Sequence, residues 1–200
     1  MADMQSPRLP KLDQNKLTAE QNALADSIKA GPRGQFKMSG PFAIYLHSPT
    51  FGELAQKLGG HLRFKTSVTP RLSEFAILCT AQHWKAQYEW FMHAPMAEKA
   101  GVKPETVRDI QAGRMPKKAP KDEQAIYAFV KELYATKRVS TGAYNRVKKV
   151  LGEAGTVQVD YPIAGIGAAA PGVPAGGGSM MQGGGMMGPG GGAMAPMNKP

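Results

Sequence analysis

The chain has very few groups that could cross-link it or anchor it in a membrane. Cys79 is the one cysteine among 200 residues, so neither an intrachain disulfide nor a zinc site built from cysteines is possible. No run of 18 apolar residues occurs, and residues 1–9 lack the apolar stretch of a secretory signal. These absences are typical of a protein from a reducing compartment. We therefore predict a cytoplasmic location and no membrane partner.

Acidic residues are missing from the C-terminal part of the chain. Residues 161–200 contain no aspartate or glutamate and form a mixture of glycine, proline, alanine and methionine without a periodic apolar face. Such a composition cannot bury enough apolar surface to offset the entropy of ordering it. We therefore predict an N-terminal arm over residues 1–17, a folded domain over residues 18–159 and a disordered tail over residues 160–200.

The chain has an excess of basic residues, with a formal net charge of +10. Such an excess fits a nucleic acid, a membrane surface or an anionic substrate. The lysines and arginines are scattered, however, and their small groups at 117–121 and 146–149 have no interleaved aromatic residues. We interpret them as solvated helix faces and loops, and we predict no nucleic-acid partner.

Apolar residues recur with a helical period and never with a sustained period of two. Phe51, Leu54 and Leu58 are spaced by three and four residues. Thr18 to Gln21 has the pattern of a capping box, which starts a helix. The segment 72–84 is apolar almost all round, which predicts a buried helix. Ser140 is expected to cap a last helix that ends at Gly152 or Gly155. We predict an all-α fold of six to eight helices.

Glu74 lies in this apolar segment, where few other side chains are polar. A buried carboxylate is costly unless its pKa rises or hydrogen bonds satisfy it, and both conditions suit a general acid or base. The alternative is a structural carboxylate that pairs with Arg71 or Lys85, or one that reaches solvent.

Glu89 and His93 are four residues apart in the next predicted helix, so both lie on one face. The aromatic residues around them favour an enclosed site over a surface pair. At 100° per residue, His83 stands roughly 180° and Cys79 about 140° around the helix from Glu74. We therefore interpret His83 and Cys79 as structural residues and predict a site of Glu74, Glu89 and His93.

Several motifs resemble the carboxymuconolactone decarboxylase family, which belongs to the alkylhydroperoxidase D (AhpD-like) superfamily. The similar segments are Gly40-Pro41-Phe42, His47-Ser48-Pro49, the run from Pro70 to Leu78, Tyr88 to His93, Asp122-Glu123 and Gly152 to Gly155. The resemblance implies an AhpD-like helical fold. It matches Glu74 and His93 to the glutamate and histidine of the peroxidase branch. Ala86 and Glu89 stand where that branch has its two thiols, so its dithiol chemistry cannot be carried over.

The decarboxylase branch needs no thiol, and the resemblance implies acid–base chemistry on a small organic acid or lactone without a cofactor or a metal. His93 would protonate the carbanion left by loss of carbon dioxide, while Glu74 or Glu89 would orient it or relay the proton. We also expect a homo-oligomer. Two alternatives stay open, a non-catalytic oligomer that binds a ligand in the same pocket and a redox protein that uses Cys79.

Overall fold

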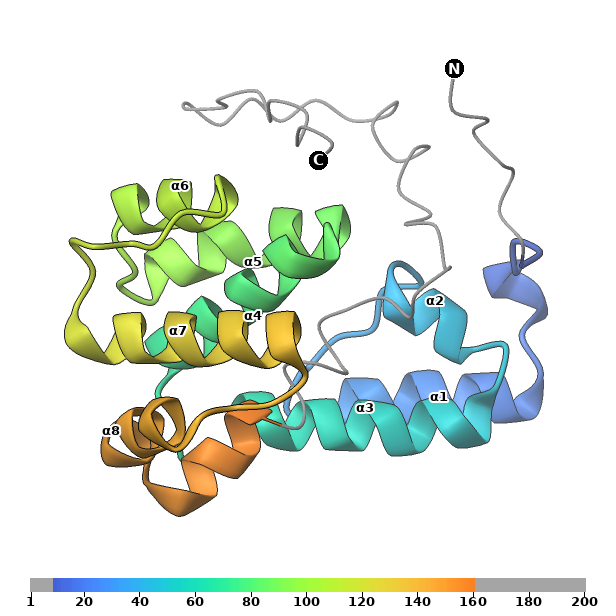
Figure 1. Cartoon of the computed structure of the whole chain (residues 1–200). Coiled ribbons are helices and arrows are strands. Elements are labelled where there is room, and N and C mark those ends of the chain that lie inside the picture. Colours follow the sequence, from blue (N-terminus) through green and yellow to red (C-terminus); the bar gives the residue numbers. More distant parts are fainter. Residues whose placement is uncertain (1–8, 161–200) are drawn as a thin grey trace.

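Helices make up the fold of residues 9–160, the part of the chain that the computed structural model describes (Figure 1). They are η1 (Gln14–Lys16), α1 (Ala19–Ala30), α2 (Pro41–Tyr45), α3 (Pro49–Phe64), α4 (Pro70–Trp84), α5 (Gln87–Lys99), α6 (Pro104–Gln111), α7 (Lys121–Thr136) and α8 (Thr141–Asp160). No strand occurs among these residues, so the predicted all-α class is confirmed. The predicted tail from residue 161 onward, and residues 1–8 of the predicted arm, lie outside the described residues.

Local sequence signals start two of the helices as predicted. Thr18 and Gln21 form the capping box, in which the Gln21 amide donates to Thr18 Oγ1 over 3.3 Å and the Thr18 amide donates to Gln21 Oε1 over 2.9 Å. Before α8, the Ala143 amide donates to Ser140 Oγ. The predicted end of α8 is wrong, because helical turns resume after Gly152 and continue to Asp160. Gly152 interrupts the helix with φ 69°, a conformation that glycine adopts without the steric cost of a Cβ.

The main hydrophobic core surrounds α4, as predicted for its apolar sequence. This helix packs against α5, α6 and α7, and α7 packs in turn against α8. The largest fully buried apolar side chains of this core are Phe75, Leu78, Ile110, Ile126 and Phe129. An element with neighbours on several sides has no solvated face, which explains why an amphipathic pattern is absent from α4.

A second, smaller core joins the N-terminal helices. Leu24 and Ile28 of α1 bury their side chains against Leu46, with Phe42 and Tyr45 of α2 packed around them. Both α1 and α2 pack against α3. Figure 1 shows these three helices on the opposite side of the molecule from α6, α7 and α8. The fold therefore has two groups of helices, each with its own core.

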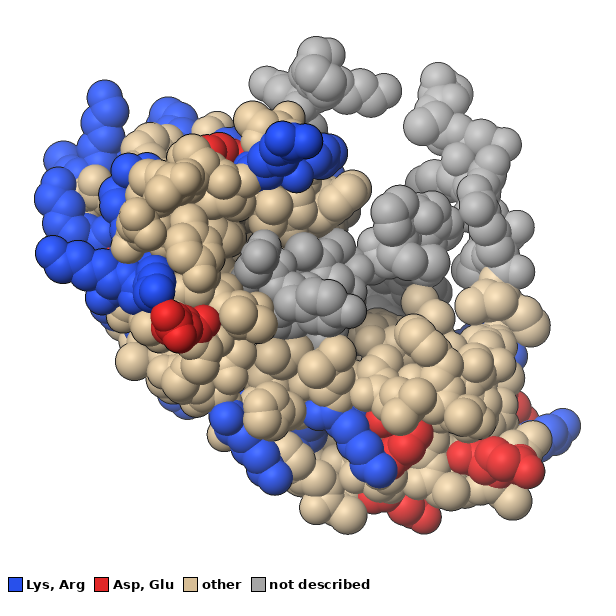
Figure 2. Space-filling view, turned by 60° about the horizontal axis from the view of Figure 1, so that its bottom comes forward, with Lys and Arg blue, Asp and Glu red and all other residues tan. Residues whose placement is uncertain are grey.

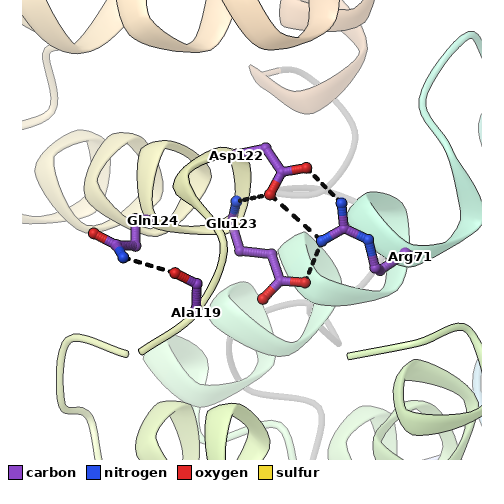
Figure 3. Close-up of polar contacts among 5 residues, drawn as sticks. All are labelled: Arg71, Ala119, Asp122, Glu123 and Gln124. Carbon is purple, nitrogen blue, oxygen red and sulfur yellow. Dashed lines mark hydrogen bonds and ion pairs between the residues drawn. The ribbon is translucent and has the colours of Figure 1, made fainter. Parts of the chain in front are cut away.

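A partly buried ion cluster connects α4 to α7 (Figure 3). The guanidinium of Arg71 donates to the carboxylates of Asp122 and Glu123. The Glu123 side chain is 1% exposed. Because burial of a charge is costly without a partner, packing that keeps Arg71 beside Glu123 is favoured over packing that separates them.

The surface carries the basic excess unevenly. Lysine and arginine side chains gather on the side of the molecule formed by α6, α7 and α8 (Figure 2). Among the described residues, no helix combines the length and the hydropathy needed to cross a bilayer.

Candidate active site

Glu74 lies on α4 among the side chains of the main core. Pro70 occupies the first turn of this helix, where its missing amide has no intrahelical partner to lose. The apolar residues on both sides of Glu74 then bury the helix and the carboxylate with it. The predicted burial of Glu74 is confirmed, since the residue is 6% exposed.

A tight turn brings α5 back to this carboxylate. Lys85 ends α4 in the left-handed conformation at φ 55°, and α5 begins two residues later. The imidazole of His93 reaches Glu74, with 2.7 Å between Nδ1 and Oε2. On the other side of the ring, Nε2 lies 3.3 Å from Glu89 Oε2. The three predicted site residues therefore converge.

His93 and its two carboxylates form a small proton-sharing network. Glu89 and His93 are 7% and 9% exposed, so water contributes little to the solvation of their charged forms. A neutral imidazole has one N–H and can donate to one carboxylate, whereas an imidazolium can donate to both. Burial lowers the pKa of His93, but the hydrogen bonds to Glu74 and Glu89 outweigh it and hold the pKa above its usual value. The geometry favours an imidazolium between two carboxylates.

Arg63 completes the charge pattern behind the imidazole. Its Nη2 lies 3.5 Å from Glu74 Oε1 and 3.1 Å from Met96 Sδ. The arginine paired with Glu74 is therefore Arg63 on α3. The alternative pairing with Arg71 is wrong, because Arg71 binds Asp122 and Glu123 instead. The sequence had no local signal for Arg63, since it lies on a helix of the other group.

A cavity of about 160 Å³ opens beside this network, between the two groups of helices. Its wall includes Glu89 and His93 but not Glu74. Two guanidinium groups, those of Arg33 and Arg63, also line it. The remaining wall is largely apolar or aromatic and includes Phe42, Tyr45, Leu62, Ile77, Tyr88 and Met92. The wall therefore combines positive charge with a largely apolar surface.

Cys79 and His83 are both away from the cavity wall, in agreement with their structural interpretation. Cys79 is 1% exposed in the main core, and burial raises the pKa of its thiol well above the usual range. His83 stacks on Tyr134 with 4.3 Å between ring centroids. Burial, followed by the charge of Lys137, lowers the pKa of His83. A thiol that stays protonated in an apolar core is a poor nucleophile.

Within residues 9–160, no group of three or more histidine, cysteine, aspartate or glutamate side chains is arranged to hold a metal ion. Comparison of the chain with protein-family models, curated proteins and solved structures gives no match. The residues of the site itself are therefore what indicates its chemistry.

Proposed function

We propose that the chain is an acid–base enzyme of the carboxymuconolactone decarboxylase type, acting on a small lactone or carboxylate without a cofactor. The observation that supports it best is His93, whose two ring nitrogens both contact buried carboxylates at the wall of a cavity. A proton held in this way is available to a bound molecule and sheltered from bulk water. General acid catalysis needs this combination.

The reaction would use the His93 proton after carbon dioxide has left. The bond between the substrate's carboxylate carbon and its ring breaks, and the electron pair stays on the ring as an enolate-like carbanion. The imidazolium of His93 gives its proton to that carbon, directly or through Glu89. A proton from solvent then restores the imidazolium. Arg63 and Arg33, which line the same cavity, stabilise the negative charge during these steps.

The two carboxylates have different parts in this scheme. Glu89 lines the cavity, so it can touch the substrate and relay a proton. Glu74 contacts Nδ1 of His93 from behind and is a positioning residue, which fixes the ring and favours its charged form. Loss of the Glu74 charge should therefore change the acidity of His93 without removing a wall of the cavity.

The test is turnover of small carboxylated lactones, starting with carboxymuconolactone, followed as release of carbon dioxide. We expect His93→Ala and Glu74→Gln each to abolish turnover while the circular dichroism of the helices stays unchanged. Loss of the Glu74 charge should lower the pKa of His93, because the imidazolium loses a carboxylate partner. If Glu74→Gln retains some activity, the basic limb of its pH–rate profile should therefore lie at lower pH.

His83→Ala is the matched control, because it removes an imidazole from the end of the neighbouring helix without touching the cavity. It should keep most of the activity. Full activity of His93→Ala, or an unchanged pH profile in a partly active Glu74→Gln, would contradict the proposed roles.

A non-catalytic ligand-binding protein is the second candidate, favoured by the largely apolar wall of the cavity. It predicts that His93→Ala still binds the ligand and that none of the tested carboxylated lactones is turned over.

The expected homo-oligomer stays a prediction. Helix α3 exposes Phe51, Leu54 and Leu58, which are 61%, 68% and 42% exposed and are apolar side chains of the kind that self-association buries.

A further inference from the structure

Arg33 is the cavity residue whose charge the fold leaves uncompensated. It lies in the connection between α1 and α2, and its guanidinium carbon stands 5.0 Å from the centroid of the Phe42 ring and 5.9 Å from that of Phe64. These aromatic faces hold the group in place through cation–π attraction. No carboxylate among the described residues forms an ion pair with it, whereas Arg63 on the same wall is paired with Glu74.

The hydrogen-bonding groups of Arg33 are also incompletely used. Its Nε is buried and has no hydrogen-bond partner among the described residues. Buried polar groups are nearly always bonded, so such an atom needs an explanation. Burial lowers the pKa of Arg33, and the like charge of Arg63 lowers it further. An anion between the two guanidinium groups would relieve this repulsion and could accept hydrogen bonds from their other nitrogens.

The size of the cavity limits what that anion can be. An apolar cavity of about 150 Å³ holds benzene in another protein. The present cavity, at about 160 Å³, has room for one small ring with a short substituent. The aromatic and aliphatic wall suits the ring, and a planar guanidinium suits a carboxylate, which it can bind with two parallel hydrogen bonds.

We propose that Arg33 binds the carboxylate of a single-ring organic acid whose ring fills the cavity between α2, α3 and α5. This inference concerns the same cavity as the proposed function and names the class of its ligand. It does not require that the ligand be converted.

The experiment measures binding of benzoate, with benzamide as its neutral counterpart, by isothermal titration calorimetry in a buffer without other carboxylates or phosphate. We expect millimolar or tighter binding of benzoate to the full chain. Arg33→Gln should weaken benzoate binding by about 10- to 100-fold, the effect of losing a hydrogen bond to a charged group. Benzamide binding should change by less than about threefold, because the apolar wall is kept.

Two further variants separate charge recognition from loss of structure. Arg114→Gln removes an equal charge from an exposed position outside the cavity and should leave benzoate binding unchanged. Arg33→Lys keeps the charge without the planar fork and should give an intermediate affinity, which also covers the case that Arg33→Gln does not fold.

Three results would overturn the inference. The first is that benzoate does not bind detectably to the unmodified chain. The second is that the unmodified chain and Arg33→Gln bind benzoate with equal affinity. The third is that Arg33→Gln binds benzoate and benzamide more weakly by the same factor. Benzoate offers no lactone to be converted, so the two proposals fail separately. Arg33-dependent binding without turnover of any lactone leaves this inference standing. Turnover that is equal in the unmodified chain and Arg33→Gln overturns the part given to Arg33, but it leaves the acid–base role of His93 standing.

Discussion

Arg71 offers a direct test of how buried charge supports this fold. Its guanidinium donates to Glu123 Oε1, while Glu123 Oε2 is buried and has no hydrogen-bond partner among the described residues (Figure 3). Arg71→Met would keep the apolar stem and remove the cation. It would leave a carboxylate that is 1% exposed without its cationic partner.

The expected loss of stability comes from this burial. Removing one partner of a buried ion pair costs about 3–5 kcal/mol, mainly because the remaining charge is uncompensated. The lower end applies, since the Arg71 and Asp122 side chains are each 27% exposed and retain some hydration. We therefore expect the free energy of unfolding to fall by about 3 kcal/mol. For a domain of this size that corresponds to about 6–12 °C in the melting temperature.

Urea unfolding at neutral pH measures this loss, and the midpoint should fall with little change in the slope. The double variant Arg71→Met with Glu123→Gln should regain most of the stability, because the unpaired charge is gone. Arg114→Met is the matched surface control. Its ion pair with Asp109 is largely solvated, so we expect a loss below about 1 kcal/mol.

The pH dependence of the free energy of unfolding provides a second test of this prediction. In the unmodified chain, burial raises the pKa of Glu123, although Arg71 opposes the shift. For Asp122, burial also raises the pKa, but the hydrogen bonds from Arg71 and the Glu123 amide prevail and the net pKa is lowered. The Asp122 contribution to stability is therefore present above its unfolded pKa and is lost as the pH falls through its folded pKa.

Without Arg71, both carboxyl groups should protonate at higher pH. The stability difference between the two chains should thus be largest at neutral pH and shrink as the pH falls toward about 4. A difference below about 1 kcal/mol at neutral pH, or one that grows on acidification, would refute the reasoning.

Two further predictions concern the helix packing and the thiol. Gly52→Ala should destabilise the fold by about 1–3 kcal/mol, because the new Cβ would lie 2.7 Å from Tyr45 Cβ. Gly60→Ala in the same helix, where the nearest atom is 3.6 Å away, should stabilise it by up to about 1 kcal/mol in thermal unfolding. Purified protein should show no thiol-dependent hydroperoxide reduction, and robust turnover that disappears in Cys79→Ser would contradict this.

The sequence predicted those parts of the fold that local physics determines. The capping box at Thr18 and the cap at Ser140 depend on residues within one turn, and both are present. The end of α8 was missed because the sequence cannot say whether a glycine ends a helix or only interrupts it. At Gly152 the outcome depends on tertiary packing of the next residues, among which Thr156 and Val159 are buried in the fold.

In the candidate site too, only the part that depends on local geometry could be predicted from the sequence. Glu89 and His93 share a face by helix geometry, and the tight turn after α4 brings Glu74 to them, so their convergence could be predicted. Arg63 and Arg33 could not, because they come from the other group of helices and no spacing relates them to His93. Only the tertiary packing that forms the cavity brings these cations to the imidazole.

The charged side chains around the cavity come from both groups of helices. With His93 protonated, Arg33, Arg63 and His93 are three cations against the two carboxylates of Glu74 and Glu89, an excess of one positive charge. Under the proposed function, binding of a substrate with one carboxylate would neutralise this excess, whereas a dicarboxylate such as carboxymuconolactone would leave one net negative charge. Loss of carbon dioxide then leaves the same negative charge on the ring carbon, closer to His93. Transfer of the imidazolium proton to the carbon cancels that charge. The total charge of the cavity and its ligand thus stays constant from substrate binding until product release. A constant total charge reduces the reorientation that the surrounding dipoles must undergo during the reaction.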